Sequence, residues 1–272
     1  MDAKKFKDKY GSWAMITGAS SGIGEEYAKQ LATMGFNLIL VARRIERLVK
    51  LGQQLEEKHS ISVKSIECDL SKPGFEVDLL KKVEGLDIGL LINNAGMNIE
   101  GAFYRGGFER NVQMMYLNMH APFILAYHFA QVFAERGKGG ILFTGSISSF
   151  QSYPYLTHYA ATKAYILQLS EGMYYEFKDK NVDITCLCPG ITLTEMAKGM
   201  KPNILTMEVA PVVKAGLQGL GKTSSVVPGF VNKAMMGISR HLFSRHANLK
   251  FNGDMMKKTL PAVRKDINKK SL

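Results

Sequence analysis

Three residues whose side chains could act on a carbonyl oxygen lie close together in the sequence. Tyr159 and Lys163 are four positions apart, so on a helix they project from the same face, and Ser146 ends the strand expected before that helix. Lowering the pKa of a tyrosine by two to three units takes about 3–4 kcal/mol. An ammonium about 4 Å away supplies about that much at an effective dielectric constant of ~20. Lys163 is therefore sufficient to tune Tyr159 for proton exchange with a carbonyl oxygen.

A glycine-rich turn precedes these residues in the chain. The apolar run Ala14–Ile16 leads into the turn, and a helical pattern follows it. Glycines in this context permit a tight turn and the close approach of a pyrophosphate to a helix N-terminus. The turn residues expected to bind a dinucleotide are Gly18, Ser20, Ser21, Gly22, Ile23 and Gly24. A glycine triplet alone is weak evidence, and the flanking strand and helix supply the context it needs.

The end of the second expected strand indicates which nicotinamide cofactor fits. An acidic residue there would accept hydrogen bonds from the adenosine ribose of NAD(H), but this chain has Ala42, Arg43 and Arg44. A guanidinium can bind a 2′-phosphate through two hydrogen bonds and stack on adenine. Arg43 and Arg44 therefore favour NADP(H) over NAD(H). The alternative is that both arginines are merely solvated at the start of a helix.

Strands and helices alternate along the chain and must position these groups. Apolar runs predict strands at 14–16, 37–42, 63–67, 88–92, 140–145, 182–187 and 225–227. Helical periodicity predicts helices at 23–34, 45–58, 108–135 and 155–178, and one from Thr206, as its cap, to Leu220. The pattern predicts an α/β fold, a Rossmann-like, doubly wound, mainly parallel seven-stranded sheet with helices on both faces. We expect one domain at 1–229 and a basic, partly amphipathic extension at 230–272.

The net charge of +11 is concentrated at the two ends of the chain. From residue 240 onward nine Lys and Arg face two Asp, and the first ten residues hold four Lys and two Asp. The nearly neutral remainder is not expected to bind nucleic acid. No run approaches the ~18 apolar residues of a membrane span, and no signal-peptide pattern is present. We expect a cytoplasmic protein with free thiols at Cys68, Cys186 and Cys188 and no metal site.

With their neighbouring motifs, these residues resemble the short-chain dehydrogenase/reductase family over about residues 12–229. The motifs are the turn from Thr17 to Gly24, Asp69-Leu70, Asn93-Asn94-Ala95-Gly96, Asn118, Ser146, Tyr159-Ala160-Ala161-Thr162-Lys163, and Pro189-Gly190 with Thr194. They occur in the order typical of the family. One mild departure is Thr192, where the family often has Val or Ile, and it could alter the nicotinamide pocket.

The resemblance implies a role for each matching position. Tyr159 would be the general acid in reduction and the base in the reverse direction. Lys163 would lower the pKa of Tyr159 and bind the nicotinamide ribose, and Ser146 would bind and polarise the carbonyl. Asn118 would hold a water that links Lys163 to solvent. Further cofactor contacts implied by the resemblance are Asp69, Leu70, Asn94, Ala95, Gly96, Pro189, Gly190, Ile191 and Thr194.

The substrate pocket is expected at the loop 192–203, which is the variable substrate loop of the family. The expected substrate contacts are Ser146, Phe150, Tyr153, Tyr159, Met196 and Met200. No arginine lies at an obvious carboxylate-binding position, so we expect a lipophilic ketone, aldehyde or 3-oxoacyl substrate. Each apolar side chain could instead simply pack the loop against the domain. Ser148 and Ser149 are alternatives to Ser146, which has the family's usual spacing to Tyr159.

The extension at 230–272 and the overall activity remain open to more than one hypothesis. A basic amphipathic helix can lie on a membrane surface, but packing over the active site or across a subunit interface is favoured. The resemblance implies a homodimer or homotetramer. The favoured activity is NADP(H)-dependent interconversion of a carbonyl and an alcohol. The alternative is an NADP(H)-binding sensor or scaffold without turnover, and an epimerase or dehydratase is a third, minor hypothesis.

Overall fold

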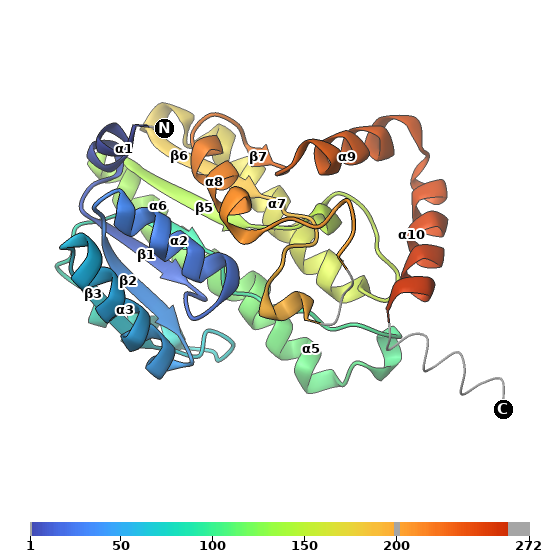
Figure 1. Ribbon diagram of the computed structural model, residues 1–272, viewed down its shortest axis with the longest axis horizontal. Coiled ribbons are helices and arrows are strands. Elements are labelled where there is room, and N and C mark those ends of the chain that lie inside the picture. The colour runs from blue at the N-terminus through green and yellow to red at the C-terminus, as the bar shows by residue number, and fades with distance from the viewer. Residues whose placement is uncertain (1, 199–201, 261–272) are drawn as a thin grey trace.

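The computed structural model describes residues 2–198 and 202–260 (Figure 1). Its seven strands form one sheet in the order β3-β2-β1-β4-β5-β6-β7, and every neighbouring pair is parallel. The strands are β1 (Trp13–Thr17), β2 (Asn37–Ala42), β3 (Val63–Glu67), β4 (Ile88–Asn93), β5 (Gly139–Thr144), β6 (Val182–Leu187) and β7 (Ser225–Val226). The strand order reverses between β1 and β4, where open parallel sheets bind ligands at the strand carboxyl ends. The predicted doubly wound sheet is confirmed.

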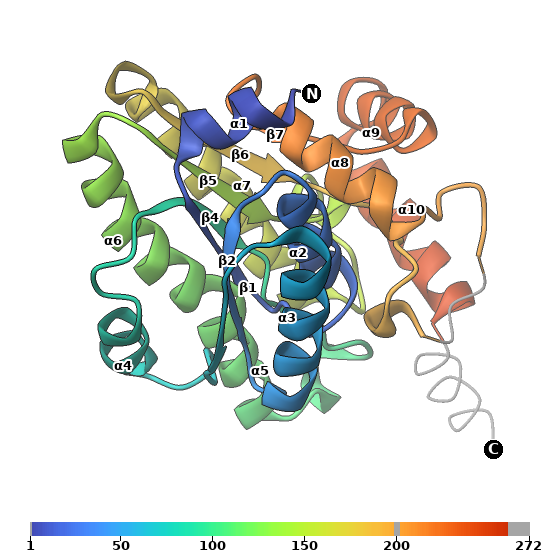
Figure 2. The ribbon, with the colours of Figure 1, turned by 60° about the vertical axis from the view of Figure 1, so that its left-hand side comes forward.

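Helices cover both faces of the sheet because both faces of its strands are apolar (Figure 2). On one face lie α2 (Gly22–Thr33), α3 (Ile45–His59) and α8 (Val209–Gly219), and on the other lie α4 (Phe75–Lys82), α6 (Ala121–Arg136) and α7 (Thr157–Glu176). In β2, Leu38 and Leu40 pack on the first side, whereas Ile39 and Val41 pack on the second. A strand buried on both faces has a continuous apolar run in its sequence.

The long helix predicted at 108–135 is present with an irregularity in its middle. It consists of α5 (Phe108–Met115), a π-helical segment at Tyr116–His120 and α6, and the backbone stays in the right-handed helical region at both junctions. Such π segments are frequent at functional sites. This one carries Asn118, one of the predicted catalytic residues.

Three local features differ from the sequence prediction. α1 (Ala3–Tyr10) and α4 were not predicted, because both are short and follow lysine-rich or turn-forming sequence. Thr206 does not cap α8: Glu208 precedes that helix, and the Thr206 hydroxyl accepts a hydrogen bond from the Asn203 N–H at 2.9 Å. The prediction for Thr206 is wrong because its side chain closes a turn in the preceding loop.

Two helices follow the sheet and form a separate arm. α9 (Phe230–Leu242) and α10 (Arg245–Thr259) lie at the side of the molecule opposite β3 (Figure 1). Ser244 separates them, and its hydroxyl accepts a hydrogen bond from the Ala247 N–H at 3.2 Å, which caps α10. No helix among the described residues is long and apolar enough to cross a membrane. The arm, which consists of α9 and α10, lies beside the carboxyl ends of the central strands.

Candidate active site

A cavity of about 1290 Å³ extends from the glycine-rich turn, past the ends of β4, β5 and β6, to α9 and α10. The predicted cofactor residues that line it are Gly18, Ser20, Ser21, Gly22, Ile23, Arg43, Arg44, Asp69, Leu70, Asn94, Ala95, Gly96, Tyr159, Lys163, Pro189, Gly190, Ile191 and Thr194. Gly24 and Asn118 lie behind its walls. Residues from six separate segments of the sequence thus share one space.

The glycine-rich turn requires glycine for two physical reasons. Gly18 and Gly22 have φ values of +68° and +58°, in the left-handed region. A Cβ at Gly18 would lie 2.8 Å from the Cα of Ala95, and one at Gly24 would lie 2.2 Å from the Gly18 oxygen. A Cβ at Gly22 would lie 3.0 Å from a methyl carbon of Thr194. Gly22 therefore lets Thr194 pack closely against the start of α2, and a helix N-terminus of this kind can hold a pyrophosphate through backbone N–H groups.

Arg44 lies at the mouth of this space and is held from both sides. Its Nη2 donates to the hydroxyls of Ser20 and Ser21 at 2.9 and 2.8 Å, and its Nη1 donates to Glu195 at 2.8 Å. Glu195 also accepts a hydrogen bond from Arg47 at 2.5 Å, and the two guanidinium groups lower its pKa to about 2. Arg43 is exposed beside it. Glu195, which the sequence did not single out, therefore links the substrate loop to the cofactor end.

Asp69 and Asn94, which the resemblance assigns to cofactor binding, both line the cavity. Burial alone would raise the pKa of Asp69, but two hydrogen bonds from Ser71, with the charges of Arg43 and Lys72, lower it. Asn94 donates from its amide to the Thr17 carbonyl oxygen at 3.0 Å. That bond joins the ends of β1 and β4. The backbone N–H of Asn94 also donates to the Thr17 hydroxyl at 3.0 Å, so both nitrogens of Asn94 hold the loop after β4 against the end of β1.

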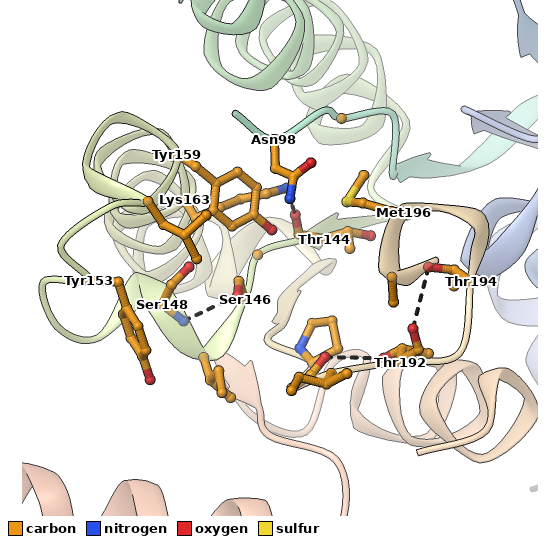
Figure 3. Close-up of a pocket in the computed structure, with 18 of the residues that line it drawn as sticks. Asn98, Thr144, Ser146, Ser148, Tyr153, Tyr159, Lys163, Thr192, Thr194 and Met196 are labelled. Atoms are coloured by element: carbon orange, nitrogen blue, oxygen red, sulfur yellow. Dashed lines mark hydrogen bonds between the residues drawn. The ribbon is translucent and has the colours of Figure 1, made fainter. Parts of the chain in front are cut away.

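The three residues predicted to act on a carbonyl converge on one wall (Figure 3). Lys163 donates from Nζ to the Thr144 carbonyl oxygen at 2.7 Å, and its Nζ is 5.8 Å from the centre of the Tyr159 ring. Ser146 hydrogen-bonds the side chain of Tyr159. The Ser146 oxygen also accepts a hydrogen bond from the Ser148 N–H at 3.1 Å, which fixes its position. A substrate oxygen can reach both hydroxyl groups from the cavity.

The pKa of Tyr159 differs from the sequence expectation. Burial raises it to about 12, although the hydrogen bond from Ser146 opposes the shift. Burial also lowers the pKa of Lys163 to about 8, and the nearby thiols of Cys186 and Cys188 oppose that shift. The expected lowering by Lys163 is absent because its ammonium is directed to Thr144 and both groups are withdrawn from water. At neutral pH Tyr159 therefore holds its proton and Lys163 is charged.

Asn118 lies behind Lys163 rather than in the cavity. It is 1% exposed, accepts a hydrogen bond from the Met97 N–H and donates to the Met97 carbonyl oxygen, both at 2.9 Å. It also donates to the Thr162 hydroxyl at 3.0 Å. A Cβ at Gly96 would lie 3.4 Å from the Asn118 oxygen and 3.5 Å from the Lys163 nitrogen. Asn118 thus joins the loop after β4 to the helix that carries Tyr159 and Lys163.

The predicted substrate contacts are only partly brought together. Ser146, Tyr153, Tyr159 and Met196 line the cavity. Phe150 does not, because its ring packs beneath the Arg240 guanidinium at 4.9 Å. Met200 lies outside the described residues. Of the alternative serines, Ser149 accepts a hydrogen bond from the Ser146 N–H at 3.1 Å, and the buried Ser148 hydroxyl has no partner among the described residues.

Packing of the extension over the active site was one of the two favoured arrangements, and α9 and α10 do form a wall of the cavity, but none of their residues was predicted to line it. The members of this wall, with the residues that follow each helix, are Asn232, Met235, Met236, Ile238, Ser239, Phe243, Ala247, Asn248, Phe251, Asn252, Met255, Met256, Thr259 and Leu260. Asn248 and Asn252 are four positions apart and share a helix face. That spacing was visible in the sequence, but it indicates no site until the arm is seen to fold over the cavity. The described residues contain no group of three or more His, Cys, Asp or Glu that could hold a metal.

Comparison with known proteins places this geometry in context. The chain is 32% identical to a 7beta-hydroxysteroid dehydrogenase of Clostridium sardiniense over 236 residues. The aligned segment covers 85% of this chain and 90% of the relative. It is 34% identical to a very-long-chain 3-oxoacyl-CoA reductase of Neurospora crassa, over 80% of this chain and 67% of the relative. A short-chain dehydrogenase from Sphingobium yanoikuyae, solved with NADPH, superposes with a TM-score of 0.75 at 32% identity, over 85% and 95% of the two chains.

A family profile also matches the chain, in agreement with these relatives and with the residues of the site. Residues 12–204 match the short chain dehydrogenase profile, and this segment holds the glycine-rich turn, Ser146, Tyr159 and Lys163. The family comprises oxidoreductases that use a nicotinamide cofactor, as the resemblance implied. The chain belongs to the short-chain dehydrogenase family.

Proposed function

We propose that this protein is an NADP(H)-dependent oxidoreductase that reduces a bulky, lipophilic ketone to its alcohol. The observation that carries the proposal is the single cavity in which Ser146, Tyr159 and Lys163 face the same space as the glycine-rich turn. A cofactor site and a proton donor in one cavity are what hydride transfer to a carbonyl requires. A sensor would need the first but not the second.

Arg44 supports the choice of NADP(H). It lies at the end of β2, where its hydrogen bonds to Ser20, Ser21 and Glu195 mark a position that can bind anionic oxygen. An acidic residue in this position would repel a 2′-phosphate. The NADPH complex of the Sphingobium yanoikuyae relative has the same overall fold and supports the same cofactor. We further propose that the Ile191 N–H binds the carboxamide, because Met207 already donates to the Ile191 oxygen.

When bound, the cofactor supplies the hydride. Ser146, held by the Ser148 N–H, donates its hydroxyl to the carbonyl oxygen of the substrate and orients it. Tyr159, which is protonated at neutral pH because its pKa is about 12, gives its proton to that oxygen as negative charge develops there. Lys163, charged below a pKa of about 8, stabilises the tyrosinate left behind. Asn118 fixes the helix that carries both residues, and a water beside it would return the proton.

The substrate end of the cavity favours a free ketone over an acyl-CoA. One relative is named for hydroxysteroids and another for 3-oxoacyl-CoA. Coenzyme A carries phosphate groups that need cationic partners. Away from the cofactor end, the cations that line the described part of the cavity are Lys163 and Lys198. Lys163 already donates a hydrogen bond to the Thr144 carbonyl oxygen. The large apolar wall of α9 and α10 instead suits a rigid, polycyclic body.

A substrate panel measured with NADPH and NADH side by side tests the proposal. The expected result is reduction of 7-oxosteroids and similar bulky ketones, with at least about tenfold higher kcat/KM for NADPH, as expected for charged hydrogen bonds to a 2′-phosphate. Tight binding of NADPH with no turnover of any ketone or aldehyde would favour the sensor hypothesis. Higher kcat/KM with NADH would show that the assignment of Arg44 is wrong.

Two further properties belong to the proposal. Free thiols at Cys68, Cys186 and Cys188 suit a reducing compartment such as the cytoplasm. Tyr127 and Tyr175, on α6 and α7, are 61% and 82% exposed. Large exposed aromatic side chains are typical of contact surfaces. We therefore propose a cytoplasmic homodimer or homotetramer that uses these helices, and light scattering would measure its mass.

A further inference from the structure

We propose that α9, α10 and the loop before α7 form a second binding site within the cavity, which recognises an uncharged hydroxyl or carbonyl group of the substrate. This inference rests on the proposed ketone reductase function. The site, here called the arm site, consists of Gln151, Ser239, Asn248 and Asn252, and all four line the cavity. None of them hydrogen-bonds Ser146, Tyr159 or Lys163 in the described chain, so the arm site is separate from the catalytic groups.

The hydroxyl of Ser239 is the centre of the arm site. Its oxygen lies 2.6 Å from the amide oxygen of Gln151 and 2.8 Å from that of Asn248. A hydroxyl has one proton, so it can donate to only one of these two oxygens. A hydroxyl on a ligand would supply the missing donor. Rotating the Gln151 amide by half a turn pairs its nitrogen with Ser239 instead, and each amide nitrogen then keeps a second N–H for a ligand oxygen.

Asn252 adds a second group to this site. It is 2% exposed, and its amide nitrogen donates to the Ser152 carbonyl oxygen at 3.0 Å. Its amide oxygen has no hydrogen-bond partner among the described residues. One turn earlier on the same helix face, Asn248 donates to the Ser239 carbonyl oxygen at 2.8 Å. Because Asn252 lines the cavity, its amide oxygen is open to accept a hydrogen bond from a ligand hydroxyl at the arm site.

The surroundings of the arm site determine the charge of its ligand. The apolar side chains of α9 and α10 that line the cavity are Met235, Met236, Ile238, Phe243, Phe251, Met255 and Met256. Within the described range 230–260, no Lys, Arg, Asp or Glu lines it. A carboxylate or phosphate in this place would lose water without gaining a counter-charge. The arm site therefore fits a neutral oxygen on an apolar body, such as a hydroxyl of a polycyclic ketone.

A matched pair of ligands and variants tests the arm site. The ligands are a 7-oxosteroid with one additional ring hydroxyl and the same ketone without it. The wild-type protein should reduce the hydroxylated ketone with about tenfold higher kcat/KM, as one hydrogen bond predicts. In Ser239→Ala and Asn252→Leu this ratio should fall to about 1–2, while the kcat/KM of the plain ketone stays constant. Ser152→Ala, whose side chain is exposed and outside the cavity lining, is the control and should keep the wild-type ratio.

The possible failures are distinguishable. Turnover of both ketones with an unchanged ratio in Ser239→Ala and Asn252→Leu, or with no preference in the wild-type protein, would overturn the arm site and leave the proposed function intact. No turnover of either ketone by the wild-type protein would overturn both. Equal losses for both ketones in the variants would indicate a structural role and count against the arm site. NADPH titration and thermal melting show whether each variant is folded.

Discussion

The two ends of the cavity are built in different ways. At the cofactor end, short segments after β1, β4 and β5 are tied together by hydrogen bonds, and Ser20 and Leu70 are 8% and 3% exposed. At the arm, Phe243 and Phe251 line the cavity while 54% and 62% exposed. Phosphate binding and proton transfer need fixed donors, whereas an apolar substrate needs surface that becomes buried on binding. We therefore propose that the first end determines the reaction and the second selects the substrate.

Among the substitutions that test this division between the two ends, Tyr159→Phe should have the largest effect on activity. Removing the proton donor should lower kcat about 10²–10⁴-fold and leave the Kd for NADPH unchanged, because the ring remains in place. Stopped-flow reduction and fluorescence titration measure the two quantities. Tyr155→Phe is the control, since Tyr155 does not line the cavity. Turnover that survives undiminished would show that Tyr159 is not the acid.

Replacing Arg44 with Ala should lower the ratio of kcat/KM for NADPH to that for NADH by about 10–100-fold, since charged hydrogen bonds to the 2′-phosphate are lost. The affinity for the ketone should stay constant. Arg47→Ala is a matched control, because Arg47 shares Glu195 with Arg44 but does not line the cavity. Equal effects in the two variants would indicate that the ion pairs with Glu195 matter, rather than phosphate binding.

Replacing Phe251 with Ala sharpens the assignment of the arm to substrate binding. Loss of an apolar contact of this size should raise KM for a bulky ketone by about tenfold and leave a small ketone such as cyclohexanone unaffected. Phe230→Ala is the control, since Phe230 lies on α9, is 87% exposed and is outside the cavity lining. A change in NADPH affinity would contradict the division between the two ends.

Replacing Lys163 with Met should have the smallest effect when the stability of the folded protein is measured instead of its activity. The folded-state pKa of Lys163 is about 8 and its ordinary value is 10.5, so burial of the charge destabilises the protein below pH 8. This cost disappears as the pH rises towards 10.5. Lys163→Met should therefore melt a few degrees higher at pH 7, on the order of 1–2 kcal/mol, and the gap should narrow by pH 9.5. A lower Tm at pH 7 would show that the bond to Thr144 outweighs the burial cost.

Much of the cofactor end was predictable because its signals are local. Gly18 and Gly22 need positive φ angles that an isolated stretch of sequence already indicates, and the run 37–42 is buried on both faces. The pKa of Tyr159 was not predictable, because it depends on how far Tyr159 and Lys163 are withdrawn from water and on the bond from Lys163 to Thr144. Phe150 was predicted to contact the substrate, but its ring packs against Arg240, which is distant in the chain.

The sequence alone determined the order of the motifs along the chain and the glycine-rich turn. It also determined the spacing of Ser146, Tyr159 and Lys163, since these features depend on residues that are close in the chain. The tertiary structure decided what faces those residues across the cavity. Ser239, which also hydrogen-bonds Asn248, meets Gln151 only because α9 and α10 fold back over the strand ends. That packing is set by contacts about 90 residues apart in the chain, which follow from the fold as a whole and not from local periodicity.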